Sequence, residues 1–286
     1  MDIISFYTVD ESARVYIANT KKLVNDAFKI HKTTPVVTAA FGRTLTAATI
    51  MGSMMKNETD LLTITIKGDG PLGGIVTTAN NGAEVKGYVY NNYVDIPLKP
   101  NGKLDVSKAV GSGTISITKD IGLKTPISGM VPLTTSEIAE DITYYYAKSE
   151  QIPTAVSLGV LVDIDYTVKE AGGFIIELLP NAKEIFINNL ENTIKNLPSI
   201  TNMLLNKDDI IKMLFENNSV IKHGEIEPKF YCNCNREKTE KALIAIGKKE
   251  LNEILVEDKK AIMHCYFCKK DYVFNDEDLK SLIFQI

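Results

Sequence analysis

The chain has 286 residues, of which 44% are hydrophobic and 24% charged, which is the composition of an ordinary globular protein. Its 32 Lys and Arg against 36 Asp and Glu give a formal net charge of -4. This balance disfavours binding to nucleic acid or to an anionic membrane through a broad basic face, because neutralising phosphates needs such a face. The length predicts one large domain or two.

The first residues lack the cationic flank and long apolar core of a secretory signal, so we expect a cytoplasmic protein. Residues 14–19 predict a strand, and residues 20–31 predict a helix that is capped near Asn19 or Thr20.

The most apolar stretch of the chain, residues 35–55, has Arg43 near its middle. A charge at the centre of a bilayer costs about 2.5–3.5 kcal/mol, whereas Pro35 suits the first turn of a helix. The stretch is therefore predicted to be a buried helix of a soluble protein, with no membrane contact.

Residues 61–90 alternate apolar and polar side chains, with turn signals at Gly70-Pro71 and Asn81-Gly82. This pattern predicts an antiparallel meander, to which residues 113–120 add a strand. The motif GDGPLG, residues 68–73, has the glycine spacing of a dinucleotide site. Such a site needs a helix next, and the strand-like residues that follow indicate a hairpin turn instead.

Residues 134–150 are predicted to form a helix, because Thr134 and Glu137 have the spacing of a capping box. Residues 157–180 predict a hairpin that ends at Pro180. With the earlier strands and helices, these elements make residues 1–180 an α+β domain with an antiparallel sheet and its own core.

The composition changes after Pro180, and residues 181–229 predict a helical linker with no strand signal. Pro198 separates two amphipathic helical stretches. Short helices are marginal in water without packing, so we expect their apolar stripes to need a cover. The stripes are formed by Ile185, Leu190, Ile194, Leu197, Ile210, Ile211, Leu214 and Phe215.

All four cysteines lie in the last part of the chain, as Cys232-x-Cys234 and Cys265-x-x-Cys268. Two close pairs separated by 30 residues converge readily into a closed tetrahedral site of four thiolates, which is typical of structural zinc. Residues 230–286 are therefore predicted to be a small zinc domain holding one Zn²⁺ per chain, because so short a segment rarely folds on burial alone.

His264 adjoins Cys265 and is a candidate ligand or neighbour of the site, but four thiolates already fill a tetrahedral site. The strand-like residues around Cys265 and Cys268 predict a hairpin. Cys-x-Cys is unusual, because side chains at that spacing along a strand run parallel and the backbone must bend to bring both sulfurs to one metal. A disulfide across it closes a small strained ring, and strained disulfides are labile. The four thiols thus indicate a site that is oxidised and later reduced.

These residues resemble the redox-regulated 33 kDa heat-shock chaperone family of bacteria. The segments KGDGPLGGIVTTAN, YYYAKSEQIPT, AGGFIIELLP and EDKKAIMHCYFCKKDYVFNDEDL resemble family segments in the same order, so the resemblance covers nearly the whole chain. The spacing of the four cysteines is its most specific part.

The resemblance implies an ATP-independent holdase chaperone that is not an enzyme and has no catalytic residues. Cys232, Cys234, Cys265 and Cys268 would bind zinc in the reduced, inactive protein. Oxidation would form the disulfides Cys232–Cys234 and Cys265–Cys268, release the metal, and expose surfaces that hold unfolding proteins. The family also forms homodimers on activation.

Two other functions remain open on the residues alone. One is a constitutive zinc ribbon that binds RNA or a protein partner, against which the acidic charge balance and Cys-x-Cys argue. The other is a thiol–disulfide oxidoreductase that uses Cys265-x-x-Cys268. Such enzymes place the nucleophile at a helix N-terminus, whereas the residues after Cys268 continue as a strand.

Overall fold

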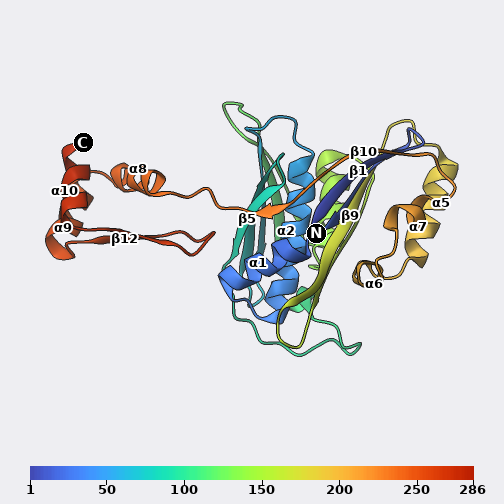
Figure 1. Ribbon diagram of the computed structural model, residues 1–286, viewed down its shortest axis with the longest axis horizontal. Coiled ribbons are helices and arrows are strands. Elements are labelled where there is room, and N and C mark those ends of the chain that lie inside the picture. The colour runs from blue at the N-terminus through green and yellow to red at the C-terminus, as the bar shows by residue number, and fades with distance from the viewer. The chain divides into compact units, whose positions relative to one another are not determined.

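The computed structural model describes all residues, Met1–Ile286, and they form two compact units, Met1–Phe230 and Tyr231–Ile286. In the first unit, two sheets enclose the helices α1 (Lys21–His31) and α2 (Pro35–Ser53) (Figure 1). The predicted α+β class is confirmed.

The first sheet has five strands in the order β10-β1-β2-β9-β8. Its bounds are β1 (Ile3–Val9), β2 (Ala13–Asn19), β8 (Thr154–Val162), β9 (Val168–Leu178) and β10 (Val220–Ile226), and the neighbouring strands pair antiparallel. The strand predicted at 14–19 and the hairpin predicted at 157–180 are confirmed. The prediction that the linker contains no strand is wrong, because β10 lies in the linker and pairs with β1. The sequence of β10 has Lys, His, Gly and Glu in its middle, so its strand conformation depends on its partner and not on local preference.

The second sheet has six strands in the order β11-β5-β4-β3-β6-β7. Its bounds are β3 (Leu61–Gly68), β4 (Gly74–Asn80), β5 (Glu84–Val89), β6 (Gly113–Asp120), β7 (Ile127–Pro132) and β11 (Lys229–Phe230). The predicted meander is confirmed, and the strand at β7 is an addition to it. Residues 68–73 form the hairpin turn between β3 and β4, where the Gly73 N–H donates to the Gly70 carbonyl at 3.0 Å. A short helix, α3 (Val106–Val110), precedes β6.

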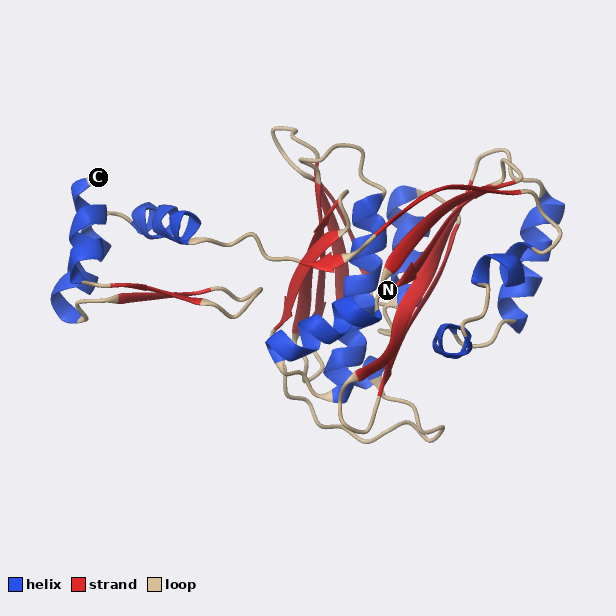
Figure 2. Ribbon diagram, in the orientation of Figure 1, coloured by secondary structure: helices blue, strands red, loops and turns tan.

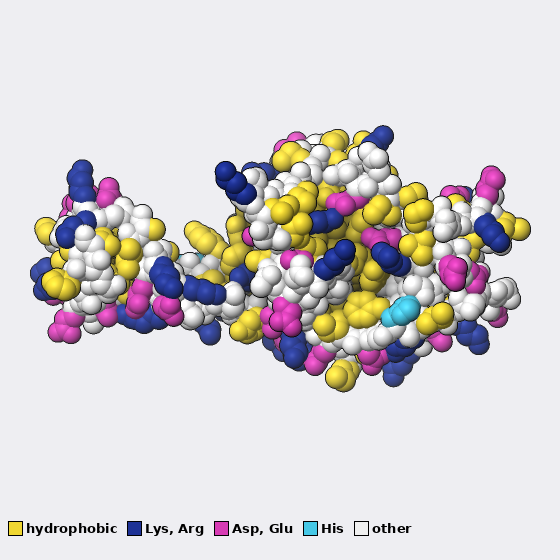
Figure 3. All heavy atoms as spheres, turned by 90° about the horizontal axis from the view of Figure 1, so that it is seen from above, with side chains coloured by type: hydrophobic (Ala, Val, Ile, Leu, Met, Phe, Trp, Pro, Cys, Tyr) yellow, Lys and Arg dark blue, Asp and Glu magenta, His cyan; other side chains and the backbone are white.

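Helix α2 lies between the two sheets, and nearly all of its residues are buried. None of the helices is both long and apolar enough to cross a membrane. Figure 3 shows hydrophobic side chains gathered in the hollow between the sheets, with Lys and Arg side chains at its rim.

Helix α1 begins where predicted, and Asn19, one of the two predicted caps, accepts a hydrogen bond from the Lys21 N–H at 3.2 Å. A further capping group is distant in sequence. The Thr20 hydroxyl contacts the Thr46 hydroxyl at 2.7 Å and does not cap the helix. Asp2 accepts hydrogen bonds from the N–H groups of Lys22 and Leu23 at 2.9 and 2.7 Å. A carboxylate at a helix N-terminus satisfies free donors and complements the helix dipole, so Asp2, the residue before β1, supplies this second cap.

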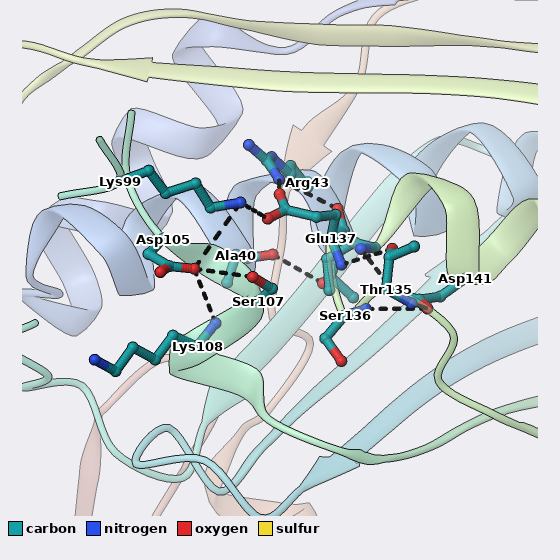
Figure 4. Close-up of polar contacts among 12 residues, drawn as sticks. Ala40, Arg43, Lys99, Asp105, Ser107, Lys108, Thr135, Ser136, Glu137 and Asp141 are labelled. Atoms are coloured by element: carbon teal, nitrogen blue, oxygen red, sulfur yellow. Dashed lines mark hydrogen bonds and ion pairs between the residues drawn. The ribbon is translucent and has the colours of Figure 1, made fainter. Parts of the chain in front are cut away.

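The capping box predicted at Thr134 and Glu137 is wrong. The helix α4 begins only at Ala139 and ends at Tyr145, and a π-helical turn, η1 (Tyr146–Glu150), follows it. The fully buried Asp141 organises the loop before the helix, since its carboxylate accepts from the N–H groups of Thr134, Thr135, Ser136 and Ile138 (Figure 4).

The linker helices α5 (Glu184–Asn196), α6 (Ile200–Asn206) and α7 (Ile210–Phe215) lie on the face of the five-stranded sheet that points away from α2 (Figure 1). The sheet and the helices form a second hydrophobic core there. Its buried members are Val9, Ala13, Val15, Phe174 and Ile176 from the sheet, and Phe186, Leu190, Ile200, Met203, Ile210, Leu214 and Phe215 from the helices. The prediction that the apolar stripes of the linker helices are covered is confirmed for most of their residues. It is wrong for Ile185, which is 70% exposed.

The second unit consists of α8 (Arg236–Ile246), α9 (Lys248–Glu257), the hairpin β12 (Ala261–His264) and β13 (Asp271–Phe274), and α10 (Asp276–Phe284) (Figure 2). The predicted hairpin is confirmed. Only five hydrophobic residues of this unit form its buried core: Leu243, Leu251, Phe274, Leu279 and Leu282. So small a core gives little stability by itself.

Candidate metal centre

Two loops of the second unit bring the four cysteines together. Cys232 and Cys234 lie in the irregular segment before α8, and Cys265 and Cys268 lie in the turn between β12 and β13. The turn is closed by two backbone hydrogen bonds, from Cys265 N–H to the Lys270 carbonyl at 2.9 Å and from Lys269 N–H to the Cys265 carbonyl at 2.8 Å. This turn, the Cys265–Cys268 knuckle, therefore presents both of its sulfurs from a fixed backbone.

All four sulfurs lie within 4.8 Å of one another, and none of them is in a disulfide. The Sγ atoms of Cys232 and Cys265 are 3.7 Å apart, and those of Cys234 and Cys268 are 3.2 Å apart. A tetrahedral zinc site with Zn–S bonds of about 2.3 Å requires sulfurs roughly 3.8 Å apart. The donor set and its spacing thus fit one metal ion of the zinc type.

The thiols have unequal acidities. Burial raises the pKa of Cys232 and raises that of Cys268 to about 12, helped by hydrogen bonds to neighbouring thiols. Burial also opposes ionisation of Cys234, but hydrogen bonds from the Tyr272 hydroxyl and from neighbouring thiols outweigh it and lower its pKa to about 7. One thiol of the cluster is therefore poised to become a thiolate, the form that binds metal and reacts with oxidants.

Two neighbours complete the site. The Tyr272 hydroxyl lies 3.2 Å from the Cys234 sulfur, and this hydrogen bond raises the tyrosine pKa to about 12. His264 is not part of the sulfur cluster, and its Nδ1 lies 2.6 Å from an Asp271 carboxylate oxygen. Sequence reasoning missed Tyr272, although its position on β13, four residues after Cys268, indicates a side chain near the knuckle.

Soft thiolate ligands select zinc over magnesium or calcium, and four of them leave no open position for a substrate. The site is thus suited to a structural ion and not to metal-assisted catalysis.

The family model described as Hsp33 protein matches residues 2–275 of this chain. The chain belongs to the Hsp33 family. Curated relatives match nearly the whole chain in sequence. The 33 kDa chaperonin of Lachnoclostridium phytofermentans is 46% identical, over 98% of this chain and 97% of its own. That of Clostridioides difficile is 47% identical, over 94% of each chain.

The crystal structure of the 33 kDa chaperonin of Thermotoga maritima matches with a TM-score of 0.93 at 35% identity, covering 99% of this chain and 98% of that one. The resemblance read from the cysteines and the four quoted segments is confirmed at the level of the Hsp33 family. Family membership makes this chain a chaperone.

Proposed function

We propose that this Hsp33 family member is a redox-regulated, ATP-independent holdase that is inactive when reduced and zinc-bound. The observation that carries the proposal is the convergence of four reduced sulfurs in a unit with only five buried hydrophobic core residues. Cys232, Cys234, Cys265 and Cys268 would hold one zinc ion per chain. Binding a structural zinc contributes about 10–16 kcal/mol, which is comparable to the stability of a whole domain.

Oxidation would remove this support by consuming the thiolates. A thiolate attacks hydrogen peroxide, breaking its O–O bond, to give a sulfenic acid and hydroxide. The neighbouring thiol then displaces the sulfenic hydroxyl as water to form the disulfide. Disulfides within each pair, Cys232–Cys234 and Cys265–Cys268, leave the two loops unconnected. The zinc ion would then lose its ligands and leave, and the second unit would unfold.

The linker provides the surface that such a switch would expose. We divide the first unit into a core, residues 1–180, and a linker, residues 181–229, whose helices cover the outer face of the five-stranded sheet. Opening the second hydrophobic core uncovers Phe174 and Ile176 on the sheet and the stripe of helices α5 to α7. A contiguous apolar patch of this kind binds non-native chains. We also propose that the active protein is a homodimer and that it acts in the cytoplasm.

The deciding experiment compares aggregation of a thermally unfolding enzyme in the presence of the reduced, zinc-loaded protein and the oxidised protein. The oxidised protein should suppress aggregation, and the reduced protein should not, with no added ATP. Equal suppression by both forms, or by neither, would refute the switch.

The geometry gives less support to the two alternatives. Cys265 and Cys268 lie in a hairpin turn followed by β13, not at a helix N-terminus that would activate an oxidoreductase nucleophile. A turnover assay with a disulfide substrate and a thiol reductant tests that function. The other alternative, a zinc ribbon that binds RNA, predicts an RNA affinity that falls steeply as the salt concentration rises, and a binding titration at several salt concentrations tests it.

A further inference from the structure

The first unit has four sheet edges, and three of them are protected. The outer edge of the five-stranded sheet at β10 has Lys222, His223 and Glu225, and such polar strands resist pairing with other chains. At the other edge, β8 is partly buried under α4 and α6. The six-stranded sheet has at one edge only the two-residue strand β11.

Strand β7 (Ile127–Pro132) is the exception. Its neighbour β6 occupies one side, and no strand pairs with the other. Its sequence, ISGMVP, has no charged residue, and Ile127 and Met130 are 52% and 67% exposed. Edges are normally blunted by charge, cover or extreme shortness. Pro132 at the end of the strand acts in that way, and α4 and η1 contact the strand at Gly129 but leave Ile127 and Met130 exposed.

The register fixes which backbone groups of β7 are available. The Leu133 N–H donates to the Gly113 carbonyl at 2.9 Å, so this residue pair is hydrogen-bonded. Hydrogen-bonded pairs alternate along an antiparallel ladder, so Val131 and Gly129 also point their backbone groups at β6. Ser128 and Met130 therefore direct both N–H and C=O outward, where neither N–H has a partner in the structure.

The side chains of β7 alternate between the two faces of the sheet. Val131 is buried, and Gly129 packs against Tyr145 and Ser149. Ser128 and Met130 lie on the solvent face of the sheet, and the Ser128 hydroxyl contacts the Thr118 hydroxyl at 2.9 Å. A strand laid along this edge would thus gain backbone hydrogen bonds and an apolar contact without displacing any side chain of the core.

We propose that the β7 edge binds an extended segment of a non-native polypeptide by strand addition, a client site separate from the linker surface. The occupant follows from the chemistry of the edge. Outward backbone donors and acceptors at Ser128 and Met130 match any extended chain regardless of its sequence, and neutral side chains impose no charge preference. The role of this site in holding clients rests on the proposed function, whereas strand binding itself does not.

The edge is formed within the first unit and owes nothing to the four cysteines. It is therefore available in reduced and oxidised protein alike. The reduced protein should bind extended peptides weakly at β7, and oxidation should add the linker surface to the same client. This distinguishes the edge from the switch.

The test uses the full-length protein and a synthetic peptide of alternating Val and Thr with Lys at both ends. A second peptide of the same sequence is N-methylated at alternate backbone nitrogens, which keeps the side chains and prevents strand pairing. Hydrogen exchange should show slower exchange at the Ser128 and Met130 amides with the first peptide only, in both redox states.

Matched variants isolate the backbone contribution. Ser128→Pro removes one outward N–H, and proline is tolerated on an edge strand at such a position. We expect it to weaken peptide binding roughly fivefold, the effect of one hydrogen bond. Ser128→Ala, which keeps the N–H and loses the same hydroxyl, should bind like the wild type. A second pair of variants avoids proline, which can disturb β7. Met130→Lys places a charge on the edge and should weaken peptide binding, whereas Met130→Leu should bind like the wild type. Equal melting temperatures and zinc contents verify that the variants fold.

The outcomes separate this proposal from the holdase function. Unchanged binding by both Ser128→Pro and Met130→Lys, or protection only outside β7, overturns the edge site while leaving the switch intact. Protection of β7 that grows with protein concentration in the absence of peptide assigns the edge to a second copy of this chain, which also overturns it. Protection by peptide with no aggregation suppression by oxidised protein supports the edge and refutes the proposed function.

Discussion

At the scale of single residues, the four cysteine sulfurs would carry much of the stability of the second unit through the proposed zinc ion. Removing one sulfur would leave three ligands and an open position, so the loss should be larger than that of an ordinary surface substitution. The neighbouring His264 makes a useful comparison, because it adjoins Cys265 in sequence but contacts Asp271 and not the sulfur cluster.

We predict that protein purified under reductant contains about one zinc per chain and that Cys265→Ser lowers zinc affinity by more than about 100-fold. Metal analysis in the presence of a competing chelator measures both quantities. The control His264→Asn should keep its zinc. Freshly reduced, unchelated wild type without zinc would refute the metal site.

The pairing of the cysteines on oxidation is a second question at this scale. Two sulfur contacts join different pairs, Cys232 with Cys265 at 3.7 Å and Cys234 with Cys268 at 3.2 Å, so proximity alone does not select the pairs that we propose. Function does, because a bridge between the pairs closes a loop of about 30 residues and would hold the unit folded.

We therefore predict that peroxide with mild warming yields only the disulfides Cys232–Cys234 and Cys265–Cys268 and releases the zinc. Peptide mapping of the oxidised protein identifies the partners. A peptide joining Cys232 or Cys234 to Cys265 or Cys268 in active protein would contradict the mechanism.

At the scale of elements, the loop before α4 shows how an ion pair can secure a segment that has no regular structure. Asp141 fixes the loop backbone, and Glu137 at its tip contacts Arg43 on α2 at 2.7 Å and Lys99 on the long loop after β5 (Figure 4). Ser136 and Ile138 on either side have positive φ, which is costly for a β-branched residue such as isoleucine. Glu137 thus ties three segments together.

This ion pair predicts a pH dependence of stability. Burial opposes ionisation of Glu137, but hydrogen bonds from Lys99 and Arg43 outweigh it and lower its pKa below 4.5. The stabilisation is therefore present above pH 4.5 and is lost as the pH falls through the folded pKa. Glu137→Gln should cost about 2 kcal/mol near neutral pH and progressively less in acid.

Urea unfolding of both proteins across this pH range measures the difference. The exposed neighbour Glu140 provides the control, and Glu140→Gln should change the free energy of unfolding by less than about 0.5 kcal/mol at every pH. A Glu137→Gln deficit that stays constant into acid would rule out the carboxylate charge as its source.

Local patterns predicted most elements but not their boundaries. Alternation placed the meander, and apolar content placed α2, because those signals come from neighbours in sequence. Asn19 was predictable as a cap of α1 because it adjoins the helix. The Asp2 and Asp141 caps escaped prediction, since Asp2 reaches α1 from the start of the chain and Asp141 acts from inside its own helix. Strand β10 escaped for the same reason, because only its pairing with β1 makes it a strand. The cysteine spacing predicted the sulfur cluster fully, while Tyr272 needed the folded hairpin.

At the scale of the whole molecule, stability is unevenly distributed between the units. The first unit has two hydrophobic cores, and the second unit has five core residues and the sulfur cluster. Loss of metal should therefore unfold the second unit and leave the sheets intact. The composition change at Pro180 alone predicts loss of structure throughout the chain after that residue, whereas the pairing of β10 with β1 should exempt this strand.

We predict that oxidation removes hydrogen-exchange protection from helices α5 to α7 and from residues 231–286, while strands β1 to β10 keep theirs. Exchange measured on reduced and oxidised samples of the same preparation tests this. Equal loss throughout the chain, or a protected linker in protein that suppresses aggregation, would exclude the proposed exposure of the second core.

The helical part of the linker is joined to the five-stranded sheet at both of its ends, by β9 before α5 and by β10 after α7. When its helices melt, the intervening segment of about 40 residues becomes a closed loop and not a free tail. Its apolar side chains then remain at a high effective concentration near the face that they left. The linker therefore competes with a bound client for the face of the sheet. When the client leaves, the linker covers the sheet again, without dilution and without an energy source.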